Sequence, residues 1–168
     1  LYDAYKPGIS QDTRNQLEGT LKKTDPARLV EQAEELFYKR SEVAEGFHGK
    51  YWDRDNYYKA LDLISKLPEG HEARKKLVAY RLIALNDNFT REHDEDFILQ
   101  ELDALAKYHR GINDETTRKS FVRDSLAYVA STKEGSKKDK VFDGLMGKTP
   151  LIFNMSESDR KQFTEEAF

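Results

Sequence analysis

The most constraining feature of this sequence is the spacing of its apolar residues, which recur every three or four positions within segments separated by Gly and Pro. Such spacing places them on one face of an α-helix, whereas a half-buried strand needs an apolar residue at every second position. No stretch of the sequence sustains that alternation. The sequence therefore predicts an all-α fold of six or seven helices with no sheet.

Helix-capping residues and the same periodicity locate five helices in the middle of the chain. Asp25 and Pro26 form a strong helix start, because Asp accepts hydrogen bonds from free N–H groups and Pro at the first helical position gives up a donor that has no partner there. The first predicted helix spans residues 26–46, and the second follows Asp53 or Asp55 and ends before Pro68. The third spans about residues 71–86, the fourth runs from Asp94 up to Gly111, and the fifth runs from near Asp114 to about residue 129. Their shared apolar faces predict a core made of Leu36, Phe37, Phe47, Tyr57, Ala60, Leu61, Ile64, Leu77, Leu82, Leu85, Leu102, Leu105, Leu126 and Val129.

The two ends of the chain give weaker patterns within what we expect to be a single helical domain, residues 1–168. Residues 10–22 are compatible with a short helix. Residues 131–140 are polar and Lys-rich, which predicts a mobile loop. In the C-terminal segment, residues 148–168, we expect an extended apolar stretch at 151–153 and a last helix capped by Ser156 or Ser158.

The helix starts repeat along the chain. Longer helices begin near residues 26, 70 and 115, and shorter partners begin near residues 55, 95 and 139. Because one helical hairpin cannot cover its own apolar face, consecutive hairpins are expected to stack as antiparallel pairs and share a core. An α-solenoid-like stack and an irregular closed bundle are the two architectures that this spacing allows.

One short stretch resembles a known repeat family. Tyr57, Ala60 and Leu61, followed by Leu67-Pro68, resemble the second helix and the exit of a tetratricopeptide repeat. The resemblance covers about residues 57–68 and implies a protein-binding scaffold. The spacing of the hairpins exceeds the roughly 34 residues of that family, and the signature of its first helix is absent from residues 29–47.

Composition excludes several classes of protein. The sequence has no Cys, which removes disulfides and thiolate chemistry, and its net charge of −3 does not favour general binding to polyanions. No apolar stretch approaches the ~20 residues that a membrane-spanning helix needs, so we expect a soluble chain. The sequence starts at Leu1 without a basic and apolar leader, which suggests processing or truncation and leaves cytoplasmic and processed periplasmic or secreted locations open.

Aromatic residues are densest in residues 47–58, where five of the 19 aromatics and the only Trp occur. Tyr, Trp and Arg dominate the energetics of protein interfaces. The sequence therefore predicts a non-enzymatic module that binds a protein or peptide through an aromatic inter-helix loop. Its predicted anchors are Tyr51, Trp52, Arg54 and Tyr58. The structural alternative is that these rings close the end of the first hairpin.

The alternative function is a metal-dependent or carboxylate-based hydrolase whose site assembles only in three dimensions. Residues 91–96 are rich in His and carboxylates, but consecutive helical residues radiate outward, and acids in a first turn are favoured by the helix dipole. No two histidines share the spacing of co-ligands on one helix face; they are His48, His71, His93 and His109. No G-x-S-x-G motif occurs. We assign no catalytic residue, metal ligand or cofactor from the sequence.

Nucleic-acid binding is a third and less favoured possibility. Lys137, Lys138 and Lys140 make residues 133–140 the most basic stretch, but it has neither interleaved aromatics nor an Arg to read bases.

The core assignment predicts the effect of truncating one buried side chain. Leu61→Ala is expected to lower the free energy of unfolding by about 2–5 kcal/mol, because it removes apolar contacts and leaves a cavity. Urea denaturation followed by circular dichroism measures this loss. An unchanged denaturation midpoint would contradict the placement of Leu61 in the core.

Overall fold

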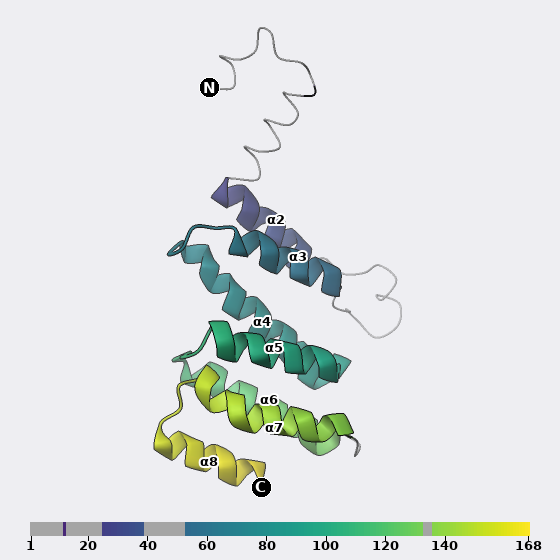
Figure 1. Cartoon of the computed structure of the whole chain (residues 1–168), viewed down its shortest axis with the longest axis vertical. Helices are drawn as coiled ribbons and strands as arrows, with labels where there is room; N and C mark the ends of the chain where they lie inside the picture. Colours follow the sequence, from purple (N-terminus) through teal and green to yellow (C-terminus); the bar gives the residue numbers. More distant parts are fainter. Residues whose placement is uncertain (1–11, 13–24, 39–52, 133–135) are drawn as a thin grey trace. The chain divides into compact units, whose positions relative to one another are not determined.

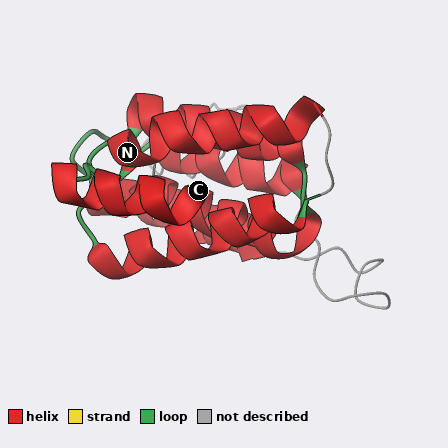
Figure 2. Cartoon of the chain, turned by 90° about the horizontal axis from the view of Figure 1, so that it is seen from below, coloured by secondary structure: helices red, strands yellow, loops and turns green. Residues whose placement is uncertain are grey.

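A computed structural model describes residue 12 and residues 25–38, 53–132 and 136–168. Over these residues the chain forms helices joined by turns, with no strand (Figure 2). The elements, in the order drawn in Figure 1, are α2 (Pro26–Tyr38), α3 (Arg54–Ser65), η2 (Glu72–Arg74), α4 (Lys75–Asp87), η3 (Asn88–Glu92), α5 (Glu95–Tyr108), α6 (Glu115–Ser131), α7 (Ser136–Ile152) and α8 (Glu157–Ala167). The predicted all-α class is confirmed.

The predicted capping residues start the helices. The side chains of Asp53, Asp94 and Asp114 accept hydrogen bonds from backbone N–H groups of the first turns of α3, α5 and α6 at 3.1, 2.9 and 3.2 Å. Ser156, rather than Ser158, caps α8 through a 3.1 Å bond from the Asp159 N–H. Each bond satisfies a donor that has no partner inside the helix, so these residues set the helix starts.

Residues 136–153 differ from what their composition predicts. The polar stretch 131–140 does not form a loop throughout, because α7 begins at Ser136, and the stretch 151–153 is not extended but ends α7 and enters a turn. The backbone N–H groups of Gly111 and Ile112 bond the carbonyl oxygens of Leu151 and Ile152, the last residues of α7. These bonds stabilise the helix end despite Pro150, whose missing N–H normally terminates a helix.

The other predicted helices shift at their ends. The third is preceded by the 3₁₀ turn η2, where His71 Nδ1 accepts a 3.1 Å bond from Ala73 N–H, and is followed by the π-helical segment η3. The predicted first helix is described as far as Tyr38. Residues 39–46 and the short helix expected at residues 10–22, apart from the single described residue Asp12, lie outside the described residues.

The chain divides into two compact units, residues 1–77 and 78–168, with the boundary inside α4. In the first unit α2 packs against α3. The ring of Phe37, near the end of α2, lies 6.3 Å from the ring of Tyr57, near the start of α3, so the two helices form an antiparallel hairpin. An ion pair joins Glu34 of α2 to Lys76, 42 residues later.

In the second unit α5 and α7 run parallel. Lys137 Nζ lies 3.3 Å from Asp96 Oδ2, Gly144 contacts Leu99 and Leu102, and Lys148 pairs with Asp103. The two residues of each ion pair are 41 and 45 positions apart in the sequence, so this separation changes little along the helix pair. Parallel neighbours separated by one intervening helix are what stacked hairpins produce, whereas an up-and-down bundle makes neighbours antiparallel.

Helices α4 and α6 form a second row behind α5 and α7. Asn86 of α4 bonds Asp124 of α6 at 2.5 Å, and Arg118 of α6 pairs with Asp159 of α8. The offsets are 38 and 41 residues, close to those between α5 and α7. Figure 1 shows α5 and α7 in front, with α4 and α6 behind them. Within this unit, α6 thus contacts both α4 and α8.

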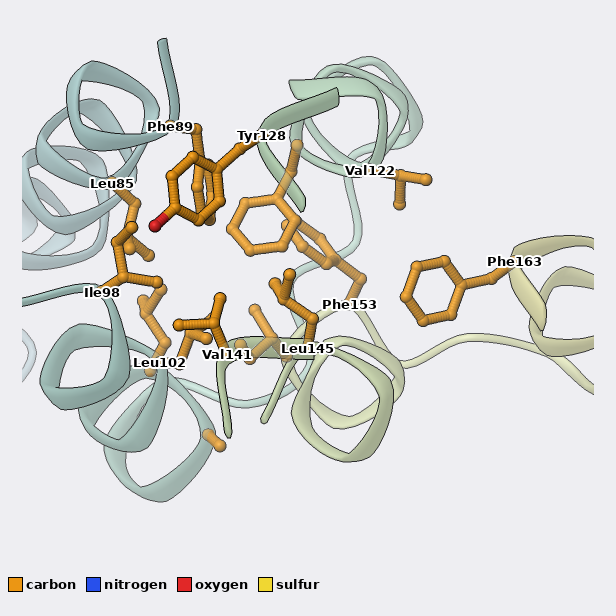
Figure 3. Packing of buried hydrophobic residues seen from close by; sticks show 14 of the residues in the cluster. Leu85, Phe89, Ile98, Leu102, Val122, Tyr128, Val141, Leu145, Phe153 and Phe163 are labelled. Carbon is orange, nitrogen blue, oxygen red and sulfur yellow. The ribbon is translucent and has the colours of Figure 1, made fainter. Parts of the chain in front are cut away.

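The core of the second unit closes between the two rows (Figure 3). Four of the predicted core residues are only half-buried, because they sit at the margin of their apolar stripe: Leu36, Leu82, Leu126 and Val129. Phe47 lies outside the described residues. The other nine predicted core residues are buried. The main omission of the prediction is C-terminal, where buried residues include Val141, Leu145, Ile152, Phe153, Met155 and Phe163.

Two glycines of α7 allow the packing of α5 on α7 to be tested. A Cβ at Gly144 would lie 3.4 Å from Leu99 Cδ2 and 3.7 Å from Leu102 Cδ1, whereas a Cβ at Gly147 meets nothing within 4 Å. Gly144→Leu should therefore push the helices apart and lower the free energy of unfolding by about 1–3 kcal/mol. Gly147→Leu, the matched control, should be neutral or raise it by up to about 1 kcal/mol through helix propensity. Equal urea midpoints for the two variants would contradict this packing.

Candidate functional site

Only two of the four sequence-predicted anchors belong to the described residues. Tyr51 and Trp52 lie outside them. Arg54 is exposed at the start of α3, and Tyr58 is half-buried with its ring 5.1 Å from that of Tyr57 in an edge-on contact. The neighbouring Tyr57 belongs to the core. The aromatic loop therefore stays a prediction.

The histidines that the structure describes have separate local roles. His71 caps η2. His93 is exposed, and its backbone lies in the left-handed region with φ of 55°. Its ring lies 5.2 Å from the ring of Tyr128. The pKa of Tyr128 is raised chiefly by burial. His109 ends α5. Within the described ranges, no three His, Asp or Glu side chains converge as they would around a metal ion. His48 lies outside the described residues.

The Lys-rich stretch includes the start of α7, and two of its lysines make contacts there. Lys137 pairs with Asp96 across to α5, and Lys138 donates a 3.0 Å bond to the backbone oxygen of Thr132. Lys140 is exposed. These contacts explain why a basic stretch is compatible with a helix start here.

A first hollow opens between α6 and α8. It has a volume of about 360 Å³, and we call it the α6–α8 pocket. Its apolar residues are Val122, Met155 and Phe163, and Figure 3 shows the Val122 and Phe163 side chains pointing toward each other. The polar residues that surround this floor are Arg118, Lys119, Arg123, Asp159, Gln162 and Glu166.

A second hollow, the α4–α6 pocket, opens on the other side of α6 and has a volume of about 350 Å³. No charged residue lines it. Its lining consists of the apolar Leu82, Ile83, Phe89 and Phe121 and the neutral polar Asn86, Thr116, Thr117 and Ser120. Phe89 and Phe121 pack edge to face with ring centroids 5.5 Å apart, which gives the pocket a rigid aromatic floor.

The two pockets flank α6, and we call the part of the second unit that holds them the α4–α6–α8 face. Helix α6 separates them, and its Lys119 and Arg123 side chains are 67% and 74% exposed. Lys119 pairs with Glu115 at 2.8 Å and Arg123 with Asp124 at 3.1 Å. The Lys119–Glu115 pair is exposed on both sides and contributes about 0–1 kcal/mol, whereas the carboxylate of Asp124 is only 14% exposed and also accepts a bond from Asn86.

Ion pairs and hydrogen bonds also shape the rim of the α6–α8 pocket. The pKa of Asp159 is lowered, first by its hydrogen bond with Ser156 and then by Arg118. The pKa of Glu115 is lowered by the hydrogen bond and charge of Lys119, and further by Arg118. Both lowered pKa values favour the ionised carboxylates. Arg118 pairs with both of them and therefore lies between them. It also lines a polar hollow of about 330 Å³ beyond this rim.

Sequence reasoning missed this face, because each pocket joins residues about 30 to 40 positions apart. Ile83 and Thr116, or Val122 and Phe163, share no local motif. The only indication in the sequence was the spacing of the helix starts near residues 70 and 115, which places α4 and α6 in equivalent positions of successive hairpins.

The ion pair of Asp159 predicts a pH dependence of stability. Because the pKa of Asp159 is lowered by folding, its stabilising effect is fully present above the unfolded value of 3.8 and is lost as pH falls through the lower folded value. Asp159→Asn should therefore destabilise the protein at pH 7, and its effect should shrink as pH falls below 3.8 and the carboxylate of the parent protein becomes protonated. Urea denaturation across this range measures the difference, and an equal difference at both ends would contradict the role of the charge.

No protein-family model matches the chain, and no match was found among curated proteins or solved structures. None of the described helices combines the length and apolar character needed to cross a bilayer.

Proposed function

We propose that this chain is a non-enzymatic helical module that binds a protein or peptide partner, and that the α4–α6–α8 face is its docking surface. The observation that supports the proposal is the occurrence of two apolar-floored pockets that flank the same helix, α6. Interfaces depend on a few apolar anchors that fill such pockets, with charged residues around them.

The form of the two pockets favours a polypeptide over a single small ligand. Each has the volume of a small ligand site, but they are divided by α6 instead of merging into one cavity. A chain that crosses α6 places one side chain in each pocket and passes over Lys119 and Arg123. The proposal thus joins both pockets and the ridge between them in one binding event.

Two exposed apolar residues provide a matched pair of variants. Ile83 lines the α4–α6 pocket and is 44% exposed, whereas Leu151 at the end of α7 is 40% exposed and lines neither pocket. Replacing either with Asp adds one charge at a site of similar burial. Only the charge at residue 83 lies in the otherwise uncharged pocket.

The experiment selects peptides from a random displayed library on the unmodified protein and measures their affinities by fluorescence anisotropy. Ile83→Asp should weaken binding at least tenfold, because an apolar side chain must then desolvate a carboxylate. Leu151→Asp should leave the affinity within about twofold. Far-ultraviolet circular dichroism of both variants checks that the helices persist.

The same assay separates this face from the aromatic loop. If binding survives Ile83→Asp and is lost in the double variant Trp52→Ala with Tyr58→Ala, docking occurs at residues 51–58 and the α4–α6–α8 face is wrong. If no selected peptide responds to either change, the proposed docking surface is also wrong.

A further inference from the structure

The same three-residue motif, Asn-x-Ser/Thr, occurs twice in the sequence. Residues 88–90 are Asn-Phe-Thr and residues 154–156 are Asn-Met-Ser. When its middle residue is not Pro, this motif is the acceptor for N-linked glycosylation of chains that enter the secretory pathway. Because so short a motif also arises by chance, the structural surroundings of each Asn decide whether the folded protein can carry a glycan there.

The first motif is enclosed by the fold. Asn88 is only 4% exposed and lies in the π-helical segment η3. Its Nδ2, the atom that would carry the sugar, donates a 2.9 Å bond to the backbone oxygen of Ala84, and its Oδ1 accepts a 3.3 Å bond from the backbone N–H of Asp94. A glycan on Nδ2 would bring a large hydrated group into this buried position, which is costly. The fold is therefore incompatible with a glycan at Asn88.

The second motif lies at the surface. Asn154 is exposed in the turn that joins α7 to α8 (Figure 1), and its φ of 46° places it in the left-handed region that Asn adopts more readily than most residues. The neighbouring Phe153 and Met155 are buried, so the turn is attached to the core while Asn154 stays accessible. Asn154 lines the open polar hollow of about 330 Å³. A hydrated sugar at this position needs no rearrangement of the core.

The third residue of this motif also has a structural role. Ser156 is exposed, and its Oγ caps α8 by accepting a 3.1 Å bond from the backbone N–H of Asp159. Thr can both complete the motif and cap a helix, whereas Asp can cap a helix but does not complete the motif. Substitutions at residue 156 can therefore separate the loss of the motif from the loss of the cap.

We infer that Asn154 is the N-glycosylation acceptor of this chain and that Asn88, which has the same motif, is not. In the transfer, the side-chain amide nitrogen of Asn154 forms a bond to the anomeric carbon of the first sugar of a lipid-pyrophosphate-linked oligosaccharide. The bond between that carbon and the pyrophosphate oxygen breaks, and the lipid pyrophosphate leaves with the electron pair. The amide nitrogen loses one proton to solvent. This inference goes beyond the proposed docking surface and does not depend on it.

Secretion of the full chain from cultured mammalian cells, behind a cleavable signal peptide, tests the site. A glycosylated species should appear, and peptide-N-glycosidase should remove its added mass. Because that enzyme converts the acceptor amide to a carboxylate, peptide mass spectrometry should find the change at residue 154 and an intact amide at residue 88. Asn154→Gln should lose the added mass completely. Medium and cell lysate are both measured, so that protein retained in the cell is counted.

Matched variants separate the motif from the fold. Ser156→Thr should keep the glycan and Ser156→Asp should lose it, whereas the urea midpoints of the two proteins after enzymatic deglycosylation should agree, because both keep the cap of α8. Thr90→Ala destroys the first motif but leaves Asn88 and its two hydrogen bonds in place. It should therefore leave the added mass unchanged.

Three results would overturn the inference. They are a parent chain without added mass in both medium and lysate, an added mass that persists in Asn154→Gln, and an added mass that is lost in Thr90→Ala. Enzymatic removal of the glycan from the parent protein should leave its helical circular dichroism unchanged. A helical signal that recovers only after the glycan is removed would contradict the exposed turn on which the inference rests.

Discussion

The close parallel packing of α5 on α7 is the constraint on which the second unit depends. Gly144 leaves room for Leu99 and Leu102, and ion pairs on either side of this contact set the register of the two helices. Since α6 lies between α5 and α7 in the chain, their parallel arrangement places α6 in the opposite row. The pockets beside α6 follow from that placement.

A buried ion pair adds specificity within one hairpin of this unit. Glu101 of α5 is fully buried, and Arg81 of α4 donates to it at 2.5 Å. A buried pair adds little net stability compared with apolar residues, but the loss of one partner leaves a charge without water. It thus disfavours other registers between α4 and α5, and so helps to orient the α4 residues that line the α4–α6 pocket.

The aromatic density of residues 47–58 predicted a binding loop there, whereas the two apolar-floored pockets of the described residues lie beside α6. Composition is a local property, and it identified Tyr57 and Tyr58 without separating a core ring from a half-buried one. The α4–α6–α8 face has no comparable local signature, because Leu82, Phe89, Phe121 and Phe163 are ordinary members of apolar stripes. They line the two pockets only because of which helices become neighbours.

The sequence by itself determined the helical class, the helix starts at Asp94 and Asp114, and the spacing of the hairpins, because periodicity and capping act within a few residues. The structure decided that Asp53 and not Asp55 caps α3, and that Ser156 and not Ser158 caps α8. Only the tertiary structure decided that residues 136–152 form one helix, since its end is stabilised by Gly111 and Ile112 from a distant loop. The same holds for the pockets. They form where side chains about 30 to 40 residues apart meet, and the packing of neighbouring helices, not local preference, brings those residues together.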